Sequence, residues 1–367
     1  MLQEGEVSPT QTYAERYHEI IAEAVLADRL GFSTFGTSEQ HFSPPRFTVS
    51  APEVLYAAIA AQTSQIKLRT MASVLLAWNH PVLVAERLAT LDIVSSGRAE
   101  ICTARSNNLH TLEAFGVDPA ETKAQWAESM ELLVKAISQE TVEHHGRFWD
   151  FPELEIVPRP VQTPHPPISV AASSVGSHVT AGERGLGAIC FENYFGFDYL
   201  QRCIDGYAQG LATGGQIAPA RNEQLGLYVA TAFCAETREE AKRVARDVAL
   251  GYFQFIVDLY VPLAKRAGYE YMDEVATIVE HAGDLDFLVT QTPSVMIGTP
   301  EDFVQRLREL EERGVHEVLL RVDGFGHEHN LRALELIGRE VIPAVDAEGF
   351  AFGGDASQSD TSPVIAS

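Results

Sequence analysis

Residues 31–42 read GFSTFGTSEQHF, and this stretch determines how the rest of the chain is interpreted. An amphipathic segment ends at Gly31, and a short apolar run follows it. Four polar residues that can bind a ligand or exchange a proton come next: Ser38, Glu39, Gln40 and His41. We predict that residues 33–37 form one strand of a βα barrel, because barrels of this class hold their active sites in the loops that follow the strands. The polar residues are therefore candidates for an active site.

Helical and strand-like patterns alternate along the chain. Apolar residues at helical spacing predict helices at residues 12–30, 51–63, 81–94, 120–138, 175–184, 197–211, 238–265, 300–313 and 329–345. Short apolar runs predict strands at residues 33–37, 66–76, 98–104, 168–172, 188–191, 225–235 and 317–322. This alternation predicts a parallel sheet, and the expected fold class is an α/β barrel of the TIM (βα)8 type.

The domain organisation that we expect is simple. Residues 1–346 are predicted to form a single barrel domain, with a hairpin-bearing loop at 140–167 and an irregular insertion at 268–296. Residues 347–367 are low in order-promoting residues and are predicted to be a flexible tail.

The number of predicted strands is one short of a closed barrel. Seven strands are predicted, whereas this class of barrel has eight, and the missing strand belongs before the first helix. Residues 1–11 look too polar and too short for a buried strand. The alternatives are a barrel with a gap and a start codon assigned too late, and we favour the second because an unpaired strand edge is a liability.

Bulk properties exclude several classes of protein. The formal net charge is −24, which argues against binding to a nucleic-acid backbone, and no run approaches the length of a membrane span. The four cysteines are scattered without CxxC spacing, and the first ten residues lack the pattern of a signal peptide. We therefore expect a cytoplasmic enzyme. No HxH follows the first predicted strand, so no metal is expected, and no GxGxxG or P-loop pattern is present.

The stretch ASSVGS at residues 172–177 is a candidate phosphate site. It follows a predicted strand and opens a predicted helix, where backbone N–H groups attract anions. Ser173, Ser174 and Ser177 can add hydroxyl donors. The alternative is simple helix capping by serine, which is compatible with phosphate binding.

Five segments in this order resemble one family. They are ADRLGFSTFGTSEQHF (27–42), HPVLVAERLATLDIVSSGRAEI (80–101), EAFGVDPAETKAQWAESMELL (113–133), GRFWDFPELEIVPRPVQTPHPPISVAASS (146–174) and GTPEDFVQRLRELEERGVHEVLLRV (298–322). The chain resembles the luciferase-like flavin-dependent monooxygenases from about Arg16 to Val345. The resemblance implies reduced FMN supplied by a separate flavin reductase, O2 as co-substrate, a small organic substrate and a homodimer.

The resemblance also implies catalytic residues, with one departure. Glu39, Gln40, His41 and Phe42 occupy the place of the family's Glu-His-His-Phe. Gln40 stands where the luciferase branch has its catalytic histidine, and a glutamine cannot exchange a proton at neutral pH. His41 matches the second histidine, so it is the predicted acid–base group, with Glu39 and Gln40 beside it. The alternative is a histidine that only orients Glu39.

Cofactor and substrate residues follow from the same resemblance. It implies a non-prolyl cis peptide at Ala72–Ser73 against the flavin ring, with Arg105 and the three serines of residues 172–177 near the flavin phosphate. Aromatic residues at strand ends are the expected substrate wall: Phe35, Trp78 and Tyr194. The alternative is that these aromatic residues belong to the core.

Three other functions remain open from the sequence. Relatives of the same fold transfer hydride to or from a deazaflavin, which does not activate oxygen. A flavin-binding protein without activity is a second alternative, which the glutamine at position 40 favours. A lyase or aldolase is the third, although its candidate Schiff-base residue, Lys67, lies at the wrong end of its strand.

Overall fold

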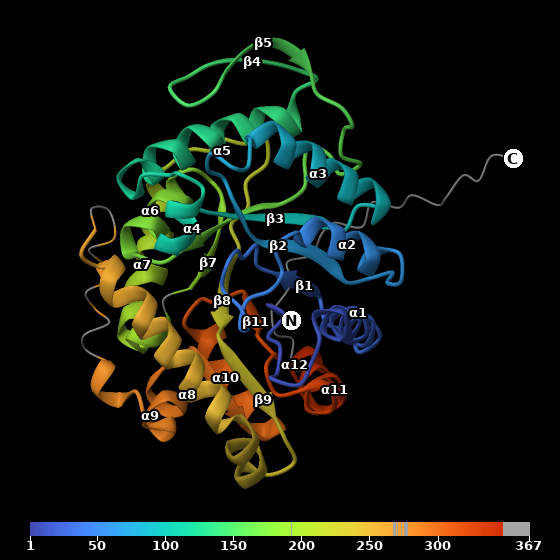
Figure 1. Ribbon diagram of the computed structural model, residues 1–367, viewed down its shortest axis with the longest axis vertical. Helices are drawn as coiled ribbons and strands as arrows, with labels where there is room; N and C mark the ends of the chain where they lie inside the picture. The colour runs from blue at the N-terminus through green and yellow to red at the C-terminus, as the bar shows by residue number, and fades with distance from the viewer. Residues whose placement is uncertain (192, 267–268, 270, 273, 275–277, 348–367) are drawn as a thin grey trace, which may run out of the picture.

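The computed structural model describes residues 1–191, 193–266, 269, 271–272, 274 and 278–347 (Figure 1). The predicted flexible tail lies outside these residues, apart from Ala347. No helix in the described part of the chain combines the length and the apolar character needed to cross a membrane.

A parallel sheet forms the centre of the fold. Its strand order is β1-β2-β3-β6-β7-β8-β11, and every neighbouring pair is parallel. The strands are β1 (Thr34–Thr37), β2 (Lys67–Val74), β3 (Ala99–Ala104), β6 (Ile168–Ala172), β7 (Gly187–Cys190), β8 (Leu225–Val229) and β11 (Glu317–Leu320). They confirm the prediction of an α/β barrel, because each begins close to a predicted position.

Residues 1–4 occupy the place between β11 and β1. Leu2 forms parallel bridges with both Gly36 and Arg321, and the amide of Gln3 donates to the carbonyl of Gly36 (3.0 Å). All four residues are buried. The prediction that this segment is too polar and too short for a buried position is therefore wrong, although only isolated bridges and no strand are assigned to it, and the barrel sheet has seven strands in the described residues.

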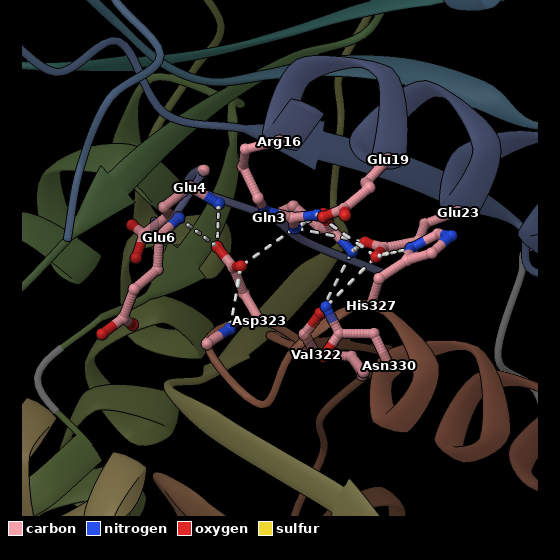
Figure 2. Close-up of polar contacts among 12 residues, drawn as sticks. Gln3, Glu4, Glu6, Arg16, Glu19, Glu23, Val322, Asp323, His327 and Asn330 are labelled. Carbon is pink, nitrogen blue, oxygen red and sulfur yellow. Dashed lines mark hydrogen bonds and ion pairs between the residues drawn. The ribbon is translucent and has the colours of Figure 1, made fainter. Parts of the chain in front are cut away.

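A buried polar network explains why these polar residues are tolerated there. Arg16, which is 2% exposed, bonds Asp323 (3.0 Å) and Glu23 (3.1 Å) and also contacts the Gln3 side chain. Figure 2 shows Asp323 between Arg16 on one side and the backbone amides of Glu4 and Glu6 on the other. Every carboxylate in this network has donors, and these contacts offset part of the desolvation cost of burying the polar segment.

Helices surround the sheet in the predicted order. They are α1 (Tyr13–Arg29), α2 (Pro52–Ala60), α3 (Pro81–Val94), α5 (Thr122–Ser138), α6 (Val175–Glu183), α7 (Phe197–Thr213), α8 (Arg238–Leu263), α10 (Pro300–Glu312) and α11 (His327–Leu336). The last predicted helix begins with α11, passes through a π-helical turn (Ile337–Val341) and ends with α12 (Ile342–Ala347). Figure 1 shows these helices around the outside of the strands.

Some elements differ from the prediction. The expected hairpin is β4 (Thr141–His145) with β5 (Asp150–Glu155), and it lies at the edge of the molecule in Figure 1. The long strand predicted at 225–235 is divided into β8 and β9 (Thr231–Cys234). The predicted insertion contains α9 (Leu285–Gln291) and a strand, β10 (Val295–Gly298), that pairs with β9. A short helix, α4 (Leu109–Ala114), follows β3.

Candidate active site

A cavity of about 590 Å³ lies at the carboxyl ends of the sheet strands. Residues that follow five strands line it, among them Glu39 after β1, Arg105 after β3 and Ser173 after β6. This is the end at which βα barrels bind their ligands. The placement of the polar residues of 38–40 at the mouth of the barrel is therefore confirmed.

Glu39 is the centre of a hydrogen-bond cluster. Its carboxylate accepts from Asn79 Nδ2 (2.7 and 2.8 Å), Trp78 Nε1 (3.0 Å) and the amide of Val74 (3.2 Å). The side chain of Glu39 is 6% exposed. A carboxylate with this many donors joins the loop after β1 to the loop after β2, and it has little capacity left for a ligand.

His41 lies beside this cluster and not in the cavity wall. Its Nε2 is 3.0 Å from Glu39 Oε1, and its ring meets the ring of Phe115 edge-on with centroids 5.1 Å apart. Gln40 lines the cavity, whereas His41 is not among the lining residues. The contact between His41 and Glu39 agrees with the alternative that His41 orients Glu39. A catalytic role of His41 stays a prediction.

The position of the non-prolyl cis peptide in β2 differs by one residue from the prediction. The non-prolyl cis peptide joins Met71 to Ala72, not Ala72 to Ser73, and the pairing of β2 with β3 shifts register here. Ala72 lines the cavity, as predicted. Ser73 is 1% exposed and is not a lining residue. The side chains of a strand alternate between its two faces, so neighbouring residues face opposite ways.

The start of α6 carries the predicted phosphate site. Ser174 is the N-cap, and the hydroxyls of Ser174 and Ser177 form a capping box. Ser177 Oγ also accepts from the amides of Ser173 (3.1 Å) and Ser174 (2.9 Å). All three serines line the cavity, so capping and a cavity-facing position occur together.

Space and donors are available at this helix start. The first amides of any helix lack intrahelical acceptors, so those of Val175 and Gly176 can bind an anion. A Cβ at Gly176 would meet only Ser174 Oγ, at 4.0 Å, so a ligand can approach the backbone. Arg105 and Lys123 also line the cavity, which adds positive charge. Lys123 was not predicted.

An aromatic wall forms the other part of the cavity. Its members are Phe47, Phe191, Tyr194, Tyr228, Tyr252, Phe255, Tyr260, Tyr269 and Tyr271. Among the three predicted wall residues, only Tyr194 belongs to it. Phe35 is fully buried and packs edge-on against Tyr56, and Trp78 stacks on Phe115 beside Glu39. The prediction for Phe35 and Trp78 as cavity walls is thus corrected.

A signal for part of this wall was present in the sequence. Tyr252, Phe255, Leu259 and Tyr260 follow the spacing of one helical face on α8. Such a stripe ordinarily indicates a core-facing helix, and only the fold shows that part of it faces a cavity.

Glu4 is the cavity residue that the sequence interpretation missed most completely. It lines the cavity although it is only 3% exposed. Burial raises the pKa of its carboxyl to about 7, against the opposing effect of the Arg321 guanidinium. Its position could have been inferred only by treating residues 1–4 as a strand.

Comparison with known proteins agrees with this geometry. A family model described as luciferase-like monooxygenase matches residues 1–317. The oxygenase component of a flavin-dependent trigonelline monooxygenase from Acinetobacter baylyi is 27% identical over 350 residues, which cover 92% of each chain.

Solved structures give the same result. The oxygenating constituent of 3,6-diketocamphane monooxygenase from Pseudomonas putida, a type II Baeyer–Villiger monooxygenase in complex with FMN, is 25% identical. Its TM-score is 0.75, with 94% of this chain and 97% of that chain covered. The monooxygenase RslO1 from Streptomyces bottropensis has a TM-score of 0.77 at 24% identity, covering 94% and 98%, and this likeness shows the fold alone.

Proposed function

Since the chain belongs to the luciferase-like monooxygenase family, we propose that it uses reduced FMN and O2 to oxidise a small organic substrate in the cavity at the barrel mouth. The observation that carries this proposal is the composition of the cavity. One side has a helix start with three serines, and another has a wall of aromatic rings. This division suits a ligand with an anionic tail next to an apolar substrate.

The residues present fit FMN. The phosphate would lie at the start of α6, held by amides and by the hydroxyls of Ser174 and Ser177, with Arg105 as a further donor. Ala72 would meet the flat ring, because its small side chain leaves the backbone accessible. Reduced FMN supplies the electrons that activate O2, which is the chemistry of the cofactor and not of the protein.

The protein's own contribution is to position its ligands and exclude water. The aromatic side chains shield the space beside the proposed position of the flavin ring from water. Polar groups therefore act there in a medium of low dielectric constant. Glu39 holds the loops after β1 and β2 together, and His41 orients Glu39. Gln40 faces the cavity and can donate or accept a hydrogen bond.

A flavin reductase is the proposed electron donor. The trigonelline monooxygenase relative is named as an oxygenase component, which supports a separate reductase for this chain as well. A homodimer in the cytoplasm belongs to the same proposal and rests on the family resemblance.

The phosphate site can be tested by binding. We expect the Ser174→Ala, Ser177→Ala double variant to bind FMN several-fold more weakly, because it loses both hydroxyls and loosens the helix start. Fluorescence titration of FMN measures the dissociation constant. The matched control is Thr299→Ala, which removes the capping box of α10, a helix start that does not line the cavity. Equal affinity in the double variant and the unmodified protein would refute the site.

Oxygen uptake separates the proposal from its alternatives. With FMN kept reduced by a generic reductase, substrates from an aldehyde, ketone and aromatic library should become oxygenated in the presence of the protein. A deazaflavin enzyme or a flavin carrier would bind its ligand without forming an oxygenated product.

A further inference from the structure

We propose that Glu4 is a proton-donating and proton-accepting group of this cavity, which acts directly on the molecule bound there. Its use in catalysis rests on the function proposed above. Its ability to hold a proton is a property of the ligand-free protein and can be tested separately.

The position of Glu4 gives it access to a ligand. It is the last residue of the segment that completes the barrel between β11 and β1, so its side chain reaches the carboxyl end of the strands. Oε1 accepts from Ser38 Oγ (3.2 Å), and Oε2 accepts from Arg321 Nε (2.9 Å). Because Glu4 is a lining residue, a ligand in the cavity would contact its carboxyl group directly.

Tyrosines complete the surroundings of the carboxyl group. The hydroxyls of Tyr228 on β8 and Tyr252 on α8 lie 3.5 and 3.4 Å from Oε2 and 3.1 Å from each other. Tyr194 faces the same space, and burial raises the pKa values of all three phenols, so they stay neutral. They are hydrogen-bonding groups, and they leave the carboxyl as the acidic group there.

The charges around Glu4 explain why it can be protonated. Arg321 is fully buried and pairs with both Glu4 and Glu6 (2.6 Å), so one guanidinium faces two carboxylates. Asp323 also lies near Glu4, but its negative charge is balanced by Arg16 and by hydrogen bonds from backbone amides. Arg46 lies 3.7 Å from Glu6. Glu4 is the most buried member of this group on the cavity side, so desolvation favours a proton on its carboxyl group in spite of Arg321.

The three acids are not equivalent hosts for that proton. Burial alone would raise the pKa of Asp323, but Arg16 and Arg321 outweigh it and lower the pKa. Glu6 is partly exposed, with 17% of its side chain accessible. For Glu4, burial dominates and raises the pKa to about 7, close to the value at which a general acid or base works best.

The transfer is balanced within the site. When Glu4 donates, its O–H bond breaks and the proton forms a bond to a basic oxygen or nitrogen atom of the ligand. The negative charge left on the carboxylate is stabilised by Arg321 Nε and Ser38 Oγ. The reverse step returns the proton to the same carboxylate.

Glu6 provides a matched control. It pairs with the same guanidinium as Glu4, yet it does not line the cavity. If Glu4 only neutralised Arg321, then Glu4→Gln and Glu6→Gln would have similar effects. If Glu4 is the proton-exchanging group, only Glu4→Gln abolishes the titration of a buried carboxyl group near pH 7.

The first test is an infrared pH titration of the ligand-free protein. We expect the C=O stretch of a protonated buried carboxyl to disappear with a midpoint near pH 7. The band should be absent from Glu4→Gln and retained in Glu6→Gln. A band that persists in Glu4→Gln would overturn the proposal. Ser38→Ala, which removes a hydrogen bond to the carboxylate, should raise the midpoint and tests the assignment if Glu4→Gln does not fold.

The second test is catalytic and uses a substrate found by the oxygen-uptake screen. Glu4→Gln should lower kcat by about 100-fold or more and abolish the transition near pH 7 in the profile of kcat, while FMN affinity is retained. Glu6→Gln should keep that transition. An unchanged pH profile of kcat in Glu4→Gln would refute the catalytic role of Glu4. Failure of the unmodified protein to bind FMN would refute the proposed function instead.

Discussion

At the scale of single residues, Glu39 shows how a residue predicted to be catalytic can act as an organiser. Donors from Val74, Trp78 and Asn79 converge on its carboxylate, and His41 lies against it. These groups come from the loop after β1 and from the end of β2 and its following loop. The carboxylate therefore determines the relative position of two parts of the cavity wall.

Replacing Glu39 by Gln should destabilise the protein. The new amide NH2 would face donors from Trp78 or Asn79, so at least one buried donor would lose its acceptor. We expect the free energy of unfolding to fall by about 1–3 kcal/mol, measured by urea denaturation. Glu143→Gln is the control, because Glu143 is 58% exposed and pairs only with His145 in the described structure. A loss in Glu39→Gln no larger than in the control would contradict the organising role.

At the scale of secondary-structure elements, the contact between α6 and α7 positions the phosphate site. A Cβ at Gly182 would overlap the carbonyl of Tyr207, and a Cβ at Gly210 would overlap the carbonyl of Val179. The two helices therefore approach until backbone meets backbone. Because α6 is short, its packing against α7 determines where its first turn, and hence Ser174, lies.

Gly210→Ala should push α6 and α7 apart. We expect a loss of about 1–3 kcal/mol in the free energy of unfolding, and a weaker affinity for FMN because the start of α6 moves. Gly215→Ala is the matched control, since a Cβ there meets nothing within 4 Å. Denaturation and FMN titration of both variants test this. An unchanged FMN affinity in Gly210→Ala would show that the helix contact does not position the site.

At the scale of the whole molecule, buried charges join the first residues of the chain to the last strand of the barrel. Arg16, Asp323 and Arg321 hold residues 3–6 in place through side-chain and backbone contacts. These ion pairs are buried away from water. Removing one partner would therefore leave the charge of the other partner uncompensated. Their ionisation makes the stability of the whole fold depend on pH.

Asp323 and Glu4 should contribute two branches of opposite sign to the pH dependence of stability. For Asp323, with a lowered pKa, stability is present above its ordinary value of 3.8 and is lost as the pH falls below it. For Glu4, with a pKa raised from 4.5 to about 7, its own contribution to stability falls by about 3 kcal/mol as the pH rises across that interval. Burial lowers the pKa of the N-terminal amine to about 5, which acts in the opposite direction in the same interval. The Glu4 branch is therefore measured as the difference between the unmodified protein and Glu4→Gln in urea denaturation at several pH values. Glu4→Gln should abolish only the second, and a variant with an unchanged second branch would contradict the assignment.

Much of the fold followed from the sequence, because strand and helix patterns are local. Helical spacing in residues 12–30 and the apolar run at 168–172 were enough to predict α1 and β6. The polar residues of the loop after β1 were predicted as site residues because active sites of this barrel class follow the strands. The serines at the start of α6 were predicted because a helix start attracts anions. The strand β10 was missed because three apolar residues at the end of an irregular segment give little periodicity.

Only the tertiary structure decided which side chains face the cavity. Whether Glu4 is a solvated acid or a buried one depends on Arg321, which lies 317 residues away in sequence. The aromatic wall combines residues from positions 47 to 271, and Phe35 is excluded from it because its side chain points into the core. Local patterns follow from neighbours along the chain, whereas burial, partners and proton affinity follow from neighbours in space, which the sequence alone does not specify.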